Sequence, residues 1–165
     1  MTTTASPISP AEAITLQREL RALTDRFELE ALVNRLGRWL DDGRDARQAR
    51  ELLTEQIALD TPGGIAEGID AVVAQARRNH TVPTQHLITN PLIERDGDRA
   101  EITANLLVVF ADGELVAAGP RAVELPTFGR ALGERYRFEA VRTGDGWRLA
   151  RIEVAARWLA GSIPA

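Results

Sequence analysis

The sequence predicts an α+β domain in which three N-terminal helices pack on one face of a curved antiparallel sheet. Three observations lead to this fold class. Apolar residues recur at helical spacing in the first half of the chain, the period changes to two near residue 84, and Asp-Gly turn signals divide the second half into strand-length segments. With 165 residues, of which 44% are hydrophobic, the chain is long enough for one core. Helices on a concave sheet enclose a cone with an open mouth.

Helical patterns occupy the first half of the chain. The longest runs from about Pro10 to Gly43, and its apolar stripe consists of Leu29, Leu32, Val33, Leu36 and Leu40. It should end near Asp41-Asp42-Gly43, because glycine tolerates the left-handed conformation that ends helices. We then expect a helix over Ala46–Leu53, a strand over Gln56–Asp60 and a helix over Ile69–Asn79.

Strand patterns occupy the second half. The predicted strands are Thr84–Glu94, Arg99–Phe110, Leu115–Leu125, Arg130–Thr143 and Trp147–Trp158. Turns rich in Asp and Gly separate most of them, at residues 96–98, 111–113 and 144–146. We expect residues 1–17 to be a disordered leader, residues 18–160 to be the domain and residues 161–165 to be a short tail.

Composition excludes several classes of function. The net charge of −4 is the reverse of what nucleic-acid binding requires, and no apolar run approaches the length of a membrane span. The chain has no cysteine and no lysine, so cysteine nucleophiles, thiolate metal sites and lysine Schiff bases are excluded. No glycine-rich nucleotide loop, serine elbow or metal-binding cluster is present, so we expect neither a cofactor nor a metal. The N-terminus lacks the features of a secretory signal, and we expect a cytoplasmic location.

The stretch VPTQHLITNPL, residues 82–92, places two polar side chains within an apolar strand. Alternation puts His86 and Asn90 on one face, about 13 Å apart at 3.3 Å per residue. Because buried polar groups need partners, this face either lines a cavity or holds a core histidine bonded to a backbone carbonyl. Spacing alone favours the core histidine.

Asp41 is placed at the C-terminal end of the first helix, where the helix dipole disfavours a negative charge. A nearby imidazole would compensate that charge and would form an acid–base pair. A solvated helix terminus is the simpler interpretation. His80 follows the third helix, where a capping role is expected.

Three aromatic side chains are candidates for contacts with a ligand. Tyr136 is either a hydrogen-bond donor in the pocket or a residue of the outer sheet face. Trp39 and Trp158 could stack on a flat ligand, although large aromatic residues more often belong to a core or an interface.

Three stretches of the chain have a characteristic order and spacing: DRFELEALVNRLGRWLDDG at 25–43, TQHLITNPLIERDGDRAEI at 84–102 and RYRFEAVRTGDGWRLARIEV at 135–154. Together they resemble the SnoaL-like domains of the nuclear-transport-factor-2-like superfamily, whose cone-shaped fold is shared by scytalone dehydratase and ketosteroid isomerase. The resemblance covers about Leu20 to Gly161. It implies that Asp41 and His86 match the acid and base of dehydratase-like members. Many relatives have a tyrosine after the arginine where this chain has Arg35-Leu36-Gly37, which argues against steroid isomerisation.

We therefore expect an enzyme that catalyses cyclisation, dehydration or isomerisation of an apolar, polyketide-like or cyclic metabolite by proton transfer, without a cofactor. His86 would be the acid or base, Asp41 would orient it, and Asn90 or Tyr136 would bind a substrate oxygen. Further pocket residues would be Leu36, Trp39 and Trp158. The alternatives are a noncatalytic binding or assembly module, and water addition to an epoxide, for which no clear Asp-Arg-Asp set is present. We expect a homodimer through the outer sheet face, with Phe138 and Trp147 or Trp158 supplying apolar area.

Overall fold

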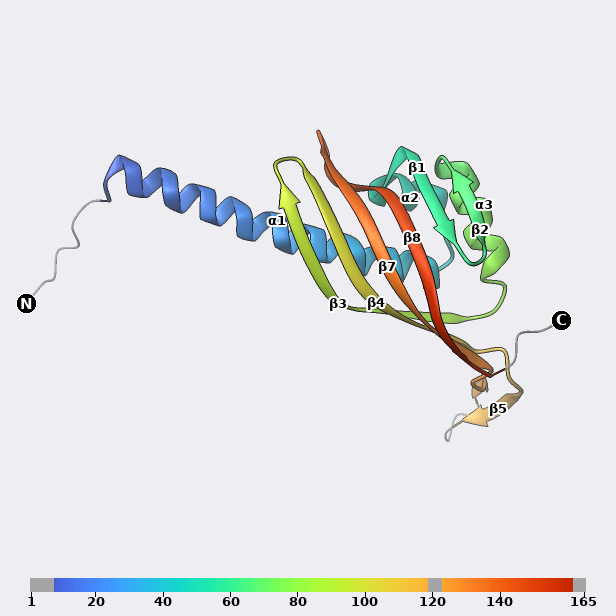
Figure 1. The fold of residues 1–165 in the computed structure, drawn as a ribbon. Helices are drawn as coiled ribbons and strands as arrows, with labels where there is room; N and C mark the ends of the chain where they lie inside the picture. The colour runs from blue at the N-terminus through green and yellow to red at the C-terminus, as the bar shows by residue number, and fades with distance from the viewer. Residues whose placement is uncertain (1–7, 119–122, 162–165) are drawn as a thin grey trace, which may run out of the picture.

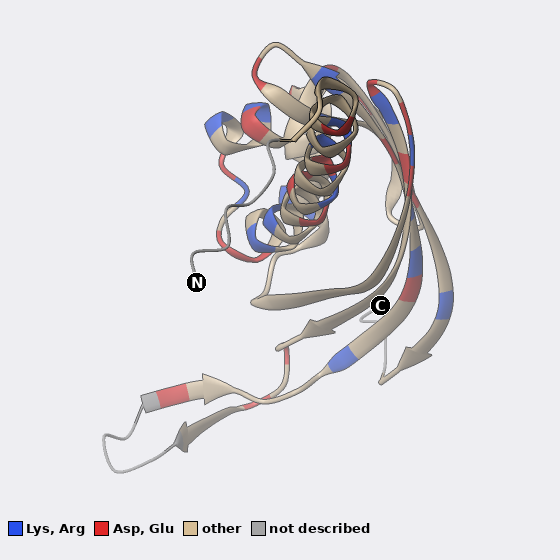
Figure 2. Ribbon diagram, turned by 90° about the vertical axis from the view of Figure 1, so that its left-hand side faces the viewer, with Lys and Arg blue, Asp and Glu red and all other residues tan. Residues whose placement is uncertain are grey.

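The computed structural model describes residues 8–118 and 123–161, and it confirms the predicted α+β class (Figure 1). The helices are α1 (Pro10–Asp41), α2 (Ala46–Leu52) and α3 (Ile69–Asn79). The main sheet contains β1 (Leu53–Thr61), β2 (Gly64–Glu67), β3 (Thr84–Asp96), β4 (Arg99–Phe110), β7 (Arg130–Thr143) and β8 (Gly146–Ala160). The helices lie on the concave side of this sheet, which curves around them without closing (Figure 2).

The strand order in the main sheet is β2-β1-β8-β7-β4-β3. The predicted antiparallel meander is correct for β3, β4, β7 and β8, but β1 runs parallel to β8. The sheet is therefore mixed. The difference arises because β1 enters from α2, before the meander begins, and takes its place beside the last strand of the chain.

The predicted strand over Leu115–Leu125 is wrong. Two short strands, β5 (Leu115–Ala118) and β6 (Val123–Pro126), pair with each other in a separate two-stranded sheet. Residues 119–122 of the predicted strand lie outside the described residues. The sequence signal against one continuous strand is the Gly119-Pro120 dipeptide, which favours a turn. The prediction followed the alternation of side chains and missed this signal.

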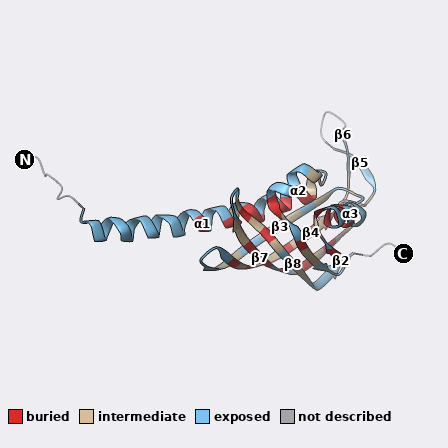
Figure 3. Cartoon of the chain, turned by 90° about the horizontal axis from the view of Figure 1, so that it is seen from above, coloured by how far each residue is buried: buried red, intermediate tan, exposed pale blue. Residues whose placement is uncertain are grey.

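Helix α1 is longer than the body of the domain requires. It begins with a capping box between Ser9 and Glu12, with a proline in its first turn, so residues 10–17 are helical and not part of a leader. Residues 8–24 are all exposed, and α1 projects past the edge of the sheet (Figures 1 and 3). The second half of the helix carries the predicted apolar stripe and packs into the core.

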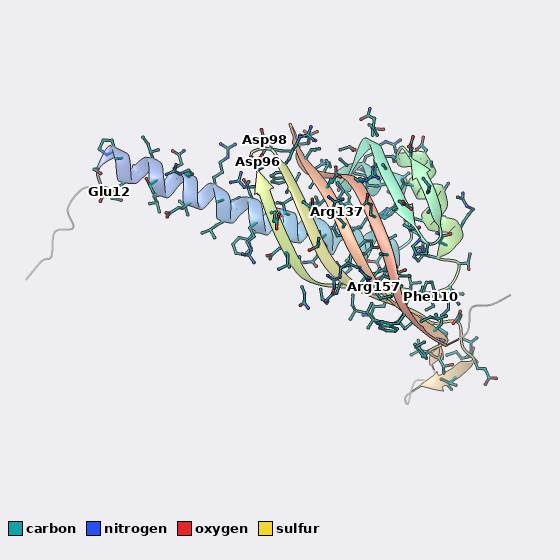
Figure 4. All side chains as sticks on the ribbon, in the orientation of Figure 1. Glu12, Asp96, Asp98, Phe110, Arg137 and Arg157 are labelled. Atoms are coloured by element: carbon teal, nitrogen blue, oxygen red, sulfur yellow. The ribbon has the colours of Figure 1, made fainter. Side chains whose placement is uncertain are left out.

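One buried charge joins α1 to strands β3 and β7. Asp25 has a side-chain exposure of 3%; its Oδ1 lies 2.5 Å from Nη2 of Arg142, and its Oδ2 lies 3.6 Å from Nε of Arg95. Arg142 also donates to Asp98 and lies over the ring of Trp147. In Figure 4 Asp98 lies at the end of the sheet where α1 leaves the body.

The convex face of the sheet is charged rather than aromatic. Arg137 donates to Glu101 and Glu153, and Arg151 donates to Glu153 (Figure 4). Phe138 and Trp147 are 0% and 3% exposed, so neither can supply the apolar area that we expected for a dimer contact on this face. Both residues belong to the core because their strands turn these side chains inward. No helix among the described residues has the length and apolarity needed to cross a membrane.

Candidate active site

The structure brings Asp41 and His86 together. Asp41 is the last residue of α1, and His86 lies near the start of β3. The Nδ1 of His86 donates to Oδ1 of Asp41 at 2.7 Å, and the backbone N–H of His86 donates to Oδ2 at 3.0 Å. The hydroxyl of Thr84 donates to Oδ1 at 3.1 Å. The carboxylate thus holds the start of β3 and fixes the orientation of the imidazole.

Gly37 makes this contact possible. It lies one helical turn before Asp41 on α1, where a Cβ atom would lie 3.3 Å from the backbone oxygen of His86. That distance is tighter than most real contacts, so a side chain at this position would push β3 away from the helix. The glycine therefore lets the strand approach closely enough for Asp41 to reach its backbone and its imidazole.

A second histidine completes a chain of hydrogen bonds. His80 follows α3, and its Nδ1 lies 2.8 Å from the carbonyl oxygen of Ala76, as the capping prediction required. Its other nitrogen, Nε2, lies 3.2 Å from Nε2 of His86, and the two ring centroids are 4.9 Å apart. The order of groups is therefore Asp41, His86, His80.

The contact between the two imidazoles requires one shared proton. A carbonyl and a carboxylate can only accept, so both Nδ1 atoms carry hydrogen. If both rings were neutral, two lone pairs would face each other across 3.2 Å. One additional proton between the Nε2 atoms removes this conflict. The pair then carries a single positive charge, which the carboxylate of Asp41 balances.

Electrostatics disfavour a charge on His80 and favour one on Asp41. Burial, together with the charge of His86, lowers the pKa of His80 to about 4, although the carbonyl of Ala76 acts in the opposite direction. Burial raises the pKa of Asp41, but hydrogen bonds from His86 and Thr84 outweigh burial and keep that pKa below its ordinary value. At neutral pH Asp41 is therefore ionised and His80 is neutral.

Both histidines lie on the wall of a cavity of about 660 Å³, a size typical of small-molecule sites. Most of its wall is apolar and comes from α1, α3 and the concave face of the sheet. The predicted pocket residues Leu36, Trp39, Tyr136 and Trp158 all line it. Arg157 and Phe110, labelled at the same end of the sheet in Figure 4, line it as well.

Polar side chains besides the two histidines also line the cavity, among them Tyr136, Glu134, Arg130 and Gln75. Burial raises the pKa of Tyr136 far above its ordinary value, and the charges of Glu134 and Asp41 raise it further, so the phenol keeps its proton. Burial also raises the pKa of Glu134. Arg130 pairs with Asp112 and lies over the ring of Phe110, which fixes its position at the cavity wall.

Trp39 and Leu36 form part of the wall without offering a free polar group. The indole Nε1 of Trp39 donates to the backbone oxygen of Asp45 at 2.8 Å, so its hydrogen is already used. Leu36 is 2% exposed and presents only methyl groups to the cavity. The phenol available to a ligand therefore comes from β7, through Tyr136, and not from α1.

The expectation for Asn90 is wrong. A β-bulge lies between Thr89 and Leu92, where β3 has one residue more than β4. Asn90 adopts a φ of 53°, is exposed, and is not among the residues that line the cavity. The extra residue reverses the alternation, so Leu92 also points outward and is 70% exposed. The Asn-Pro dipeptide was the sequence signal for this irregularity.

Two residues of the site escaped the sequence analysis. His80 was assigned only a capping role, although a short loop connects it to β3 and brings it back to His86. Glu134 was not singled out, although strict alternation along β7 places it on the same face as Tyr136. The described residues gather no group of three or more histidines or carboxylates suited to hold a metal ion.

Comparison with known families identifies the fold. The SnoaL-like domain family matches residues 21–153, which is most of the chain. The chain belongs to this family. Among functionally curated proteins, none matches. The match contains Asp41, His80, His86 and Tyr136, so the whole hydrogen-bonded chain lies within the family domain.

Solved structures show the same fold. A protein from Kribbella flavida is 25% identical, with a TM-score of 0.68, over 84% of this chain and 95% of its own. A nuclear-transport-factor-2-like protein from Novosphingobium aromaticivorans is 24% identical, with a TM-score of 0.68, over 90% and 92% of the two chains. A third, from the same organism, carries a provisional name as a scytalone dehydratase; it is 17% identical, with a TM-score of 0.68, over 87% and 91%.

Proposed function

We propose that this protein is a cofactor-independent enzyme that transfers protons on an apolar, cyclic or polyketide-like small molecule, in a cyclisation, dehydration or isomerisation. The observation that carries the proposal is the hydrogen-bonded chain of Asp41, His86 and His80 on the wall of an apolar cavity. Similar structures with provisional names as dehydratases are consistent with this class of reaction.

The three groups divide the work of a general acid and base. Protonated His86 is the acid, and Asp41 holds its ring in place and balances its charge. His80, whose Nε2 is unprotonated, accepts a proton from the substrate while His86 gives one to it, and the accepted proton then passes from His80 to His86 across the contact between their Nε2 atoms. A proton can thus leave or reach the cavity while the net charge of the three groups returns to zero after each turnover.

Tyr136 is the proposed donor to a substrate oxygen. Its phenol is 5% exposed, keeps its proton at all working pH values, and is held by stacking on Phe138 at 4.7 Å between ring centroids. A fixed neutral donor stabilises negative charge that develops on a carbonyl oxygen during enolisation. Glu134, on the same strand, provides a second carboxyl group with a raised pKa near that oxygen.

The proposal is tested by proton exchange, which does not require the product to be known. The purified protein is incubated in D₂O with a panel of enolisable cyclic ketones and β-hydroxy ketones, and deuterium incorporation and loss of water are followed by mass spectrometry. We expect catalysed exchange or elimination with at least one compound. His86→Ala should lower the rate by about 10²–10⁴-fold, the usual contribution of a positioned acid or base.

Leu87→Ala is the matched control, because Leu87 is the next residue on β3 and points to the opposite face, where it is 38% exposed. This variant should retain full rate. Both variants should remain folded at the temperature of the assay, as checked by circular dichroism. Equal rates for the native protein and His86→Ala would reject the catalytic proposal.

A noncatalytic binding protein is the second candidate, and one observation favours it. The position on α1 where the resemblance to SnoaL-like domains leads us to look for a tyrosine is Leu36 here, and this residue presents only methyl groups to the cavity. The same panel distinguishes the two. Compounds that bind, as measured by quenching of tryptophan fluorescence, but that undergo no catalysed exchange would support a binding protein.

A further inference from the structure

The projecting half of α1 carries an apolar stripe that its own domain does not cover. Leu16, Leu20, Leu23 and Phe27 are 46%, 55%, 54% and 69% exposed. Such large side chains, grouped along one helix, are unusual on the surface of a monomer. Figure 3 shows this half of the helix extending free of the sheet.

The spacing of the stripe is that of a coiled coil. Together with Ala13, the four residues are separated by three, four, three and four positions, which is the alternation of a and d positions in a heptad repeat. All five positions of the stripe, Ala13, Leu16, Leu20, Leu23 and Phe27, are apolar. This regularity distinguishes the stripe from scattered surface hydrophobic residues, which need no explanation.

The stripe faces away from the domain. At roughly 100° per residue, it lies on the side of the helix opposite to the core stripe of Asp25, Leu29, Leu32 and Leu36. A helix that packs against the stripe would therefore meet neither the sheet nor the cavity. Because residues 8–24 are all exposed, the domain offers this segment no packing partner within the part of the chain that the structure describes.

We propose that this stripe pairs with the same stripe of a second copy, in an antiparallel arrangement with two-fold symmetry. Leu20 would pack against the partner's Leu23, and Leu16 against the partner's Phe27, so every large side chain of the stripe meets an apolar side chain. A two-fold contact of this kind is self-complementary and closes after two copies.

Charge favours the antiparallel direction. In this register Glu19, which flanks the stripe, lies beside the partner's Arg26, and symmetry forms the same pair twice. Arg26 now pairs with Glu30 on its own exposed helix surface, at 3.0 Å, so it is already held at the edge of the stripe. In a parallel pair Glu19 would lie opposite an uncharged threonine, and no ion pair would form. The antiparallel pair also places the two domains at opposite ends, clear of each other.

The test uses sedimentation equilibrium of the full chain. We expect a monomer–dimer equilibrium, and Leu20→Glu should raise the dissociation constant by roughly 100-fold or more, because two charges enter the seam and two leucines leave it. Ile14→Glu is the matched control: Ile14 is 66% exposed on the same helix but lies off the stripe. The control should dimerise as the native protein does, and both variants should remain folded at the temperature of the experiment.

Charge exchange tests the register. Glu19→Arg alone should weaken the dimer, and the double variant Glu19→Arg/Arg26→Glu should recover most of the lost affinity. A chain that stays monomeric at every concentration, or a dimer that Leu20→Glu leaves intact, would overturn the proposal. A double variant that is no tighter than the single variant would overturn the antiparallel register.

Discussion

Helix α1 carries two partly or fully buried aspartates that differ in their partners. Asp25, in the middle of the helix, lies between Arg95 and Arg142. Asp41, at its C-terminal end, bonds to His86 and through it contacts His80. Burial raises the pKa of each carboxyl group, and hydrogen bonds from the partners outweigh burial in both cases, so each pKa is below its ordinary value.

The comparison shows that the partner decides what a buried carboxylate can do. An arginine keeps its proton at every working pH, so Asp25 can hold elements together but cannot take part in proton exchange. An imidazole changes charge near neutral pH, so Asp41 can tune an acid and base. The surroundings of the two aspartates differ in the same sense. The ring of Trp147 packs against Arg142, the partner of Asp25, whereas the histidines beside Asp41 border a cavity.

The largest effect is expected from Asp41→Asn. The amide would no longer balance a protonated His86, and it could present a donor where the ring nitrogen needs an acceptor. We expect the exchange rate to fall about 10³–10⁴-fold, as when the carboxylate of a catalytic triad is neutralised. The unfolding temperature should change little, because the amide oxygen can still accept from the backbone of β3. A rate within tenfold of native would contradict the role of Asp41.

A smaller effect, on stability alone, is expected from Asp25→Ala. Removing Asp25 leaves the guanidinium of Arg142 without its buried carboxylate, although Asp98 still pairs with it. We expect a loss of about 2–3 kcal/mol in the free energy of unfolding, less than for a fully buried pair because both arginines are partly exposed. Urea unfolding measures the change. Asp98→Ala, at 76% side-chain exposure, is the matched control and should cost far less. The folded variant should keep the native exchange rate. Loss of activity in folded protein would contradict the view that Asp25 acts on stability alone.

The last effect concerns the pH dependence of stability. The pKa of His80 falls from 6.5 in the unfolded chain to about 4 in the folded protein, so its contribution is present above pH 6.5 and is lost as the pH falls toward 4. The two aspartates contribute above their ordinary pKa of 3.8 and lose that contribution only at lower pH. His80→Gln should therefore flatten the stability curve between pH 6.5 and 4 and leave the part below pH 4 intact. An unchanged slope would contradict the burial of a neutral imidazole.

Much of the fold followed from local patterns in the sequence. The apolar stripe of α1, the change of period near residue 84 and the Asp-Gly turns each reflect short-range stereochemistry, and each appears in the structure close to its predicted position. The parallel pairing of β1 with β8 did not follow, because it joins strands separated by most of the chain. No local pattern encodes a contact of that kind.

The site was predictable to a similar degree. The helix dipole at Asp41 called for a compensating group, and the resemblance to SnoaL-like domains linked that residue to His86. The sequence leaves Tyr136 open between the pocket and the outer sheet face, and alternation fails at Asn90, because it assumes a strand without an extra residue. The role of His80 depends on where a loop returns, and spacing along the chain could not determine that.

The bulge in β3 also affects how this protein is compared with its relatives. Residue-by-residue alignment with a strand that lacks the extra residue slips by one place beyond Thr89, and inward and outward side chains then exchange. When cavity residues of a relative are grafted onto β3, the positions from Thr84 to Thr89 must be aligned from the N-terminal end of the strand. The positions from Leu92 to Asp96 must be aligned from its C-terminal end. Only an alignment made separately from the two ends of the strand keeps each grafted side chain on the intended face of the sheet.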